Sequence, residues 1–181
     1  MSLSSSFVTY RQRGILRRIK GTPFPLWAFI MSRISTQIII AIVQAAMLLA
    51  LAVILFDVHV SSSYVALLVL VTLGALAFLS IGFVVSAFAP NSDTADSAGS
   101  AITLPMMFLG GVFFPVDDAP SWLQPLIQIL PLSHLADGLR SVIIDGAGLT
   151  DVWLPVLVML ATAGIGLLIA VRFFRWEPRA V

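Results

Sequence analysis

Long apolar segments that alternate with short polar turns set the fold class of this chain. They cover about 35–56, 64–89, 98–114 and 152–171. A helix needs roughly 20 predominantly apolar residues to cross the hydrocarbon core of a bilayer. Only 10% of the residues are charged, whereas soluble domains carry about 25%. We therefore predict an all-α polytopic membrane protein, in which four transmembrane helices form a single membrane domain over residues 1–181.

The stretch between the third and fourth segments is apolar but interrupted. After a polar turn with Asp117 and Asp118, two apolar pieces at 123–130 and 132–140 are separated by Pro131. Each piece is too short to cross the bilayer, and proline interrupts a helix because it lacks a backbone N–H. We predict a broken helical hairpin over 115–145, lying at the membrane surface or re-entering it.

The basic residues predict the orientation. Six of the ten lie between Arg11 and Arg33, and Arg172, Arg175 and Arg179 lie at the other end. Loops rich in Lys and Arg stay in the cytoplasm, so both termini are expected to be cytoplasmic in the inner (plasma) membrane. Four spans agree with this, because an even number returns the chain to the same side. The hairpin is then on the outer side.

Residues 10–20 form a short basic segment before the first span. A helix here would carry Ile15, Leu16 and Ile19 on one stripe and basic residues elsewhere. Such a segment lies on anionic lipid or docks on a protein partner, and the pattern alone leaves both open.

Two polar details concern the helices themselves. Gln44 lies within the first span and is expected to hydrogen-bond to a neighbouring helix rather than to bind a substrate. Ser92 or Asp93 is expected to cap the helix of the third span, since short polar side chains favour that position.

One ordered set of residues resembles a known family. It runs from a glycine-rich helix end through an acidic turn to an acidic residue and an arginine, and it comprises Phe113, Phe114, Pro115, Trp122, Leu123, Pro131, Leu132, Ser133, His134, Asp137 and Arg140. This order and spacing resemble the signature of type-2 ABC exporter permeases, which carry drugs, lipids or polysaccharides out of bacteria. A broken amphipathic hairpin in some other polytopic protein remains the alternative explanation of the same residues.

The resemblance implies roles for particular residues. The basic segment is similar to the family's coupling helix, which docks on an ATPase subunit; the matching residues are Arg13, Gly14, Ile15, Leu16, Arg17 and Arg18. The hairpin is similar to the family's outer gate; the matching residues are Phe114, Pro115, Trp122, Pro131, His134, Asp137 and Arg140. Asp137 and Arg140 are one turn apart, so their pairing has either a structural role or a role in fixing the gate.

The family also implies partners. These are an ABC ATPase that binds ATP and Mg, a second permease copy and the lipid bilayer, with no nucleic acid. The substrate would be hydrophobic or amphipathic, such as a drug, a lipid or a lipid-linked glycan. The family domain usually has six spans, and the resemblance covers only its C-terminal two-thirds. A truncated reading frame, a fragment, a split subunit and an accessory subunit without transport activity all remain open.

Several chemistries are not expected on this chain. It has no G-x-x-x-x-G-K-[ST] phosphate loop, and Lys20 is its only lysine. With no cysteine and with His59 and His134 far apart in sequence, we expect no metal site, no cofactor and no catalytic residues. The remote enzymatic alternative is an intramembrane serine protease using Ser97 or Ser100 with His134 and Asp137, but neither serine lies in a G-x-S-x-G element.

Overall fold

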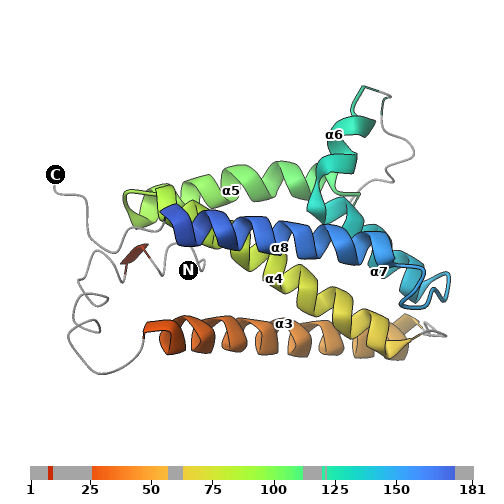
Figure 1. Cartoon of the computed structure of the whole chain (residues 1–181). Helices are drawn as coiled ribbons and strands as arrows, with labels where there is room; N and C mark the ends of the chain where they lie inside the picture. Colours follow the sequence, from red (N-terminus) through yellow and green to blue (C-terminus); the bar gives the residue numbers. More distant parts are fainter. Residues whose placement is uncertain (1–7, 10–25, 57–62, 112–119, 121, 174–181) are drawn as a thin grey trace.

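The computed structural model describes residues 8–9, 26–56, 63–111, 120 and 122–173. In this part of the chain the regular elements are all helices, which confirms the predicted all-α class (Figure 1). The helices are α3 (Leu26–Phe56), α4 (Tyr64–Phe88), α5 (Ser92–Leu109), α6 (Gln124–Ile129), α7 (Pro131–Ile143) and α8 (Trp153–Phe173).

Three of these helices are long and apolar enough to cross a membrane. They are Met31–Phe56 within α3, and all of α4 and α8. Helix α5 runs from Ser92 to Leu109 instead of covering about 98–114, and its first turns are polar. Among the described residues it is therefore not an apolar span candidate, and a fourth span stays a prediction.

Helices α4 and α8 make the most extensive contact between any two helices of the described chain. The backbones approach closely at Gly166, where an added Cβ would collide with the Ser80 side chain. The buried Ser80 hydroxyl donates to the carbonyl of Ala77 at 2.6 Å or of Thr162 at 3.2 Å. Small residues that allow such an approach, with a hydroxyl bonding across it, are typical of packing between membrane helices.

Helix α7 packs across one end of this pair. Its Val142 joins Leu70 of α4 and Val152, just before α8, in a buried apolar cluster. Gly138 of α7 fits against Pro155 and Leu70, because a Cβ there would lie 2.9 Å from the Pro155 Cβ. Helices α4, α7 and α8 thus form one packed unit, which we call the packed frame.

Helix α3 is attached differently. Its main contact is with α4, and none of its described side chains is buried. Large apolar side chains such as Leu48, Ile54 and Leu55 are exposed along it. Figure 1 shows α3 running along the side of α4 that lies away from α5 and α8. Helix α3 therefore stands apart from the packed frame.

The turn between α4 and α5 differs in one detail from the sequence expectation. Asn91 is the N-cap of α5, and its Oδ1 accepts a hydrogen bond from the Thr94 N–H at 2.7 Å. The predicted caps, Ser92 and Asp93, lie in the first turn instead. The Asp93 carboxylate is still favourably placed there, since the helix dipole attracts negative charge to its N-terminus.

Candidate functional site

The hairpin helices α6 and α7 are separated by a single extended residue. Leu130 has φ −75° and ψ 126°, and Pro131 is the first residue of α7. A proline disfavours the helical conformation of the residue before it but suits the first helical position, where its missing N–H costs nothing. The Leu130–Pro131 pair thus ends one helix and starts the next.

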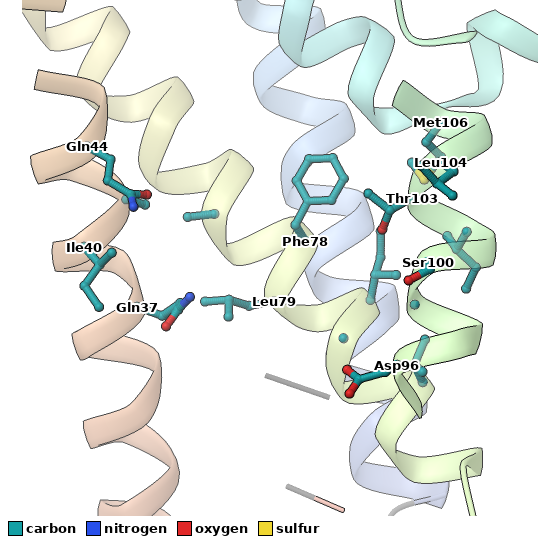
Figure 2. A pocket seen from close by; sticks show the side chains of 17 residues that line it. Gln37, Ile40, Gln44, Phe78, Leu79, Asp96, Ser100, Thr103, Leu104 and Met106 are labelled. Atoms are coloured by element: carbon teal, nitrogen blue, oxygen red, sulfur yellow. The ribbon is translucent and has the colours of Figure 1, made fainter. Parts of the chain in front are cut away.

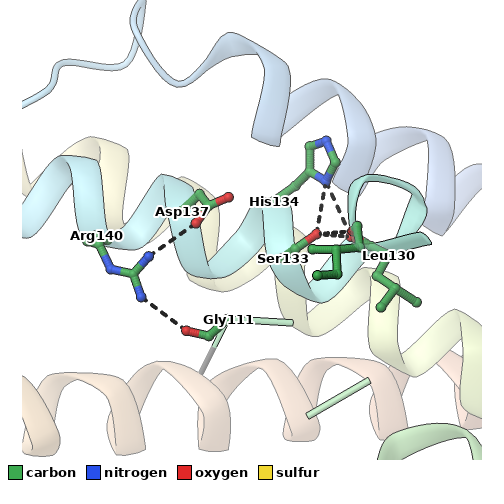
Figure 3. Close-up of polar contacts among 7 residues, drawn as sticks. Gly111, Leu130, Ser133, His134, Asp137 and Arg140 are labelled. Carbon is green, nitrogen blue, oxygen red and sulfur yellow. Dashed lines mark hydrogen bonds and ion pairs between the residues drawn. The ribbon is translucent and has the colours of Figure 1, made fainter. Parts of the chain in front are cut away.

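Polar groups of α7 gather on the carbonyls at the end of α6 (Figure 3). The buried Ser133 Oγ lies 2.7 Å from both the Ile127 and the Leu130 carbonyl oxygens, and its one proton serves one of them at a time. The His134 Nδ1 lies 3.3 Å from the Leu130 carbonyl oxygen and 3.5 Å from the Ser133 Oγ. These contacts satisfy carbonyls that a helix end leaves without internal partners, and they fix α6 to α7.

Arg140 ties the hairpin to the end of α5. Its Nη1 donates to the Asp137 Oδ1 at 3.2 Å and its Nη2 donates to the Gly111 carbonyl at 3.1 Å (Figure 3). The side chains of Asp137 and Arg140 are about half exposed. The predicted pair therefore exists, and the arginine has a second partner that the sequence did not indicate.

The glycine pair after α5 makes this junction possible. Gly111 has φ 73°, a left-handed conformation that glycine adopts without strain. A Cβ on Gly110 would lie 2.6 Å from the Met106 carbonyl oxygen and 2.9 Å from the Leu132 Cγ. Leu132 of α7 therefore rests directly on the backbone at the end of α5.

The structure describes only some of the other predicted site residues. Trp122 precedes α6 and is 75% exposed. Phe114 and Pro115 lie outside the described residues. The same holds for the coupling set, Arg13, Gly14, Ile15, Leu16, Arg17 and Arg18. Their roles remain predictions.

A cleft of about 610 Å³ lies among α3, α4 and α5 (Figure 2). Its walls are mostly apolar, with a few polar side chains: Gln37 and Gln44 from α3, and Asp96, Ser100 and Thr103 from α5. This site was not predicted from the sequence. The spacing of Asp96, Ser100 and Thr103 could have indicated it, because polar residues at i, i+4 and i+7 in α5 lie on one helix face.

Gln44 departs from its expected role. Its side chain lines the cleft. No hydrogen bond joins it to another helix within the described residues, contrary to the expected interhelical bond. Its amide is therefore available in the cleft.

The comparisons with known proteins decide the family. The sequence profile of the ABC-2 type transporter family matches residues 1–144, most of the chain. The chain belongs to this family.

Curated relatives of this ABC-2 chain come from bacteria and from Dictyostelium discoideum. The probable multidrug ABC transporter permease YbhR of Escherichia coli K12 is 26% identical over 164 residues, covering 89% of this chain and 45% of YbhR. ABC transporter G family member 20 of Dictyostelium discoideum is 28% identical over 162 residues, covering 87% of this chain and 22% of that protein. Nodulation protein J of Rhizobium leguminosarum bv. trifolii is 39% identical over 74 residues, covering 41% of this chain and 28% of that protein.

The chain spans less than half of the length of these relatives. No solved structure matches it at a significant level.

The geometry gives no support to protease chemistry in this ABC-2 chain. The polar partners of His134 are Ser133 and the Leu130 carbonyl. Within the described residues, Asp137 pairs with Arg140 and no hydrogen bond joins His134 to Ser97 or Ser100. A nucleophile must lie within hydrogen-bond reach of its base, so these side chains do not form a triad here.

Proposed function

We propose that this chain is the permease part of an ATP-driven exporter that moves a hydrophobic or amphipathic substrate outward. The observation that carries the proposal is the match of the ABC-2 type transporter profile over residues 1–144. A separate ABC ATPase supplies the energy, with ATP and Mg bound on that partner. A working exporter contains two permease domains and two ATPase domains.

The ATPase acts on the permease through residues 10–20 on the cytoplasmic side. One described residue just before this segment supports a path into the spans. Val8 is 1% exposed and packs in a cluster with Val85, Ala89 and Ala95, where α4 turns into α5. Because a packed cluster transmits displacement, motion of the basic segment reaches the ends of both helices.

The spans then rearrange around the packed frame. Helices α4, α7 and α8 stay together, since small residues and buried side chains lock their contacts. Helices α3 and α5, which border the cleft, change their separation. The hairpin stays with the packed frame through α7 and holds the end of α5 through Arg140 and Gly111, so movement of α5 against the hairpin controls release on the outer side.

Proteoliposomes that contain the permease and its cognate ATPase test the proposal. We expect wild-type protein to support ATP-dependent outward transport. Leu16→Asp should abolish this transport, because a charge in the apolar stripe disrupts docking on the ATPase. Arg17→Ala together with Arg18→Ala should lower coupling modestly and in a salt-dependent way, because rim charges mainly steer association.

Two results would contradict this account. Wild-type ATPase association in Leu16→Asp would leave residues 10–20 as a helix on the membrane surface. ATPase binding without any transport, for a panel of amphipathic substrates, would indicate an accessory subunit.

A further inference from the structure

Helix α5 is held near its two ends and not along its middle. Within the described chain its buried residues are Ala95 and Met106. Ala95 is fully buried in the cluster that also contains Val8. Each residue from 96 to 105 is at least partly exposed, and a Cβ added at Gly99 would meet no atom within 4 Å. The middle of α5 can therefore move with little loss of buried contact.

The end of α5 next to α7 is bonded to the hairpin. Arg140 donates to the Gly111 carbonyl at 3.1 Å. Gly110 lies against Leu132, because a Cβ on this glycine would come within 2.9 Å of the Leu132 Cγ. Met106 is buried just before this junction. Since α7 belongs to the packed frame, this end of α5 is fixed to the frame.

Pro105 lies between the exposed middle of α5 and this junction. Proline has no N–H, so the helical hydrogen bond from residue 105 to the Ala101 carbonyl cannot form, and the ring presses against that carbonyl. Sharp bends of a helix occur at a few kinds of site, of which proline is the foremost. Pro105 is exposed within the described chain, so buried neighbours do not lock its ring. The helix is thus weakened at a point where packing does not hold it straight.

The side of α5 on which Pro105 lies sets the direction of a bend. Pro105 and Asp96 are nine residues apart, which is about 2.5 helical turns, so they lie on opposite sides of the helix. Asp96, Ser100 and Thr103 line the cleft among α3, α4 and α5 (Figure 2). Because the ring opens the turn on its own side, the helix curves toward the other side. Bending at Pro105 therefore swings the exposed part of α5 toward the cleft.

We propose that Pro105 is a hinge, about which residues 92–104 swing as a lever while residues 106–111 stay with α7. The lever is driven at Ala95, on which Val8 packs just before the basic segment. Its swing changes the separation of α5 from α3. This inference rests on the proposed export function and names the movement through which the ATPase acts on the cleft.

Distances in the complex with the ATPase test the hinge. One pair of spin labels joins Ser97 of α5 to Leu168 of α8, and another joins Leu104 to Leu157, all at exposed positions. Ser97 lies about 12 Å from Pro105 along the helix axis, whereas Leu104 is next to it. When ATP and vanadate trap the ATPase, double electron–electron resonance should show the Ser97 distance changing by at least about 2 Å, with the Leu104 distance unchanged. Equal changes would mean that α5 moves as a rigid body, and no change in either distance would mean that it does not swing. Both results overturn the hinge.

Substitutions at the hinge give the sharpest comparison. Pro105→Ala restores the N–H and stiffens the helix, so the change in the Ser97 distance should fall at least about threefold. Pro105→Gly should keep most of the change, because glycine also leaves a helix easy to bend. Pro125→Ala is the matched control, since Pro125 is exposed and lies in the first turn of α6, where proline is tolerated. The proposal is overturned if Pro105→Ala moves as wild type does, or if Pro105→Gly is as stiff as Pro105→Ala.

Transport of the dyes Nile red and rhodamine 6G in proteoliposomes separates the hinge from the export function. We expect Pro105→Ala to lower the transport rate at least about fivefold, while the ATPase binds as it does to wild type, because the docking segment is unaltered. A chain that transports, with a Ser97 distance that does not respond to the ATPase, would overturn the hinge and leave export standing. A Ser97 distance that responds and depends on Pro105, in a chain that transports neither dye, would support the hinge and count against the export function.

Discussion

The packed frame and helix α3 differ in how far their side chains are buried by neighbouring helices. Along α4, residues such as Leu70, Ala77 and Ser80 are buried against α7 and α8. Along α3 the described side chains are at least partly exposed, including Leu48 and Ile54. Both helices are comparably apolar, so hydropathy does not explain the difference.

Small residues explain why α4 is buried more than α3. Gly74, Gly138 and Gly166 each receive a side chain of a neighbouring helix at a distance that a Cβ would block. In hydrocarbon there is little hydrophobic drive for two apolar helices to associate, so close van der Waals packing and hydrogen bonds decide which surfaces adhere. The surface of α3, which carries large side chains and borders the cleft, does not adhere to the packed frame in this way and can contact lipid or substrate or change its position.

The largest expected effect comes from filling a close contact in the packed frame. In Gly166→Val the added atoms meet Ser80, including its backbone, and overpacking should lower the free energy of unfolding by about 3 kcal/mol. Gly164→Val is the matched control, because no atom lies within 4 Å of a Cβ at that position. Unfolding in detergent, followed by circular dichroism, measures both. Equal stability of the two variants would show that α4 and α8 are not locked at this point.

A charge at the hairpin junction should have the next largest effect. Leu132→Asp places a carboxylate against the Gly110 backbone, and we expect a loss of about 2 kcal/mol in stability with strongly reduced export, while the protein still inserts. Leu126→Asp, on the exposed side of α6, should export nearly as well as wild type. If Leu132→Asp exports normally in the assembled transporter, the hairpin is only a surface cover.

Substitutions of the two members of the Asp137–Arg140 ion pair should differ in the stability that they remove. Arg140→Gln removes the bond to the Gly111 carbonyl as well as the pair, so we expect a loss of about 1 kcal/mol and slower export. Asp137→Asn removes only an exposed pair and should cost less than about 0.5 kcal/mol. Chemical denaturation in detergent compares them. Equal losses would mean that the link to α5 contributes nothing.

The sequence predicted the helical class because apolar length is a local property. Runs such as 64–89 and 152–171 correspond to α4 and α8 within a few residues. The end of α5 was harder to place: the apolar run continues past Leu109, but Arg140 and Leu132, distant in sequence, hold Gly110 and Gly111 in a turn. The cleft was missed for the same reason, since only the packed structure brings Gln44 opposite Thr103.

The central claim is that the packed frame stays fixed while α3 and α5 change their separation. Spin labels on a chain without native cysteine can test it in the complex with the ATPase. One pair is placed at Leu48 of α3 and Ala101 of α5, and a second at Leu68 of α4 and Leu157 of α8, all at exposed positions. When ATP and vanadate trap the ATPase, double electron–electron resonance should show the distance between the labels on α3 and α5 changing by at least about 2 Å. The distance between the labels on α4 and α8 should stay unchanged. A shift in the α4–α8 distance, or no change in the α3–α5 distance, would contradict the account.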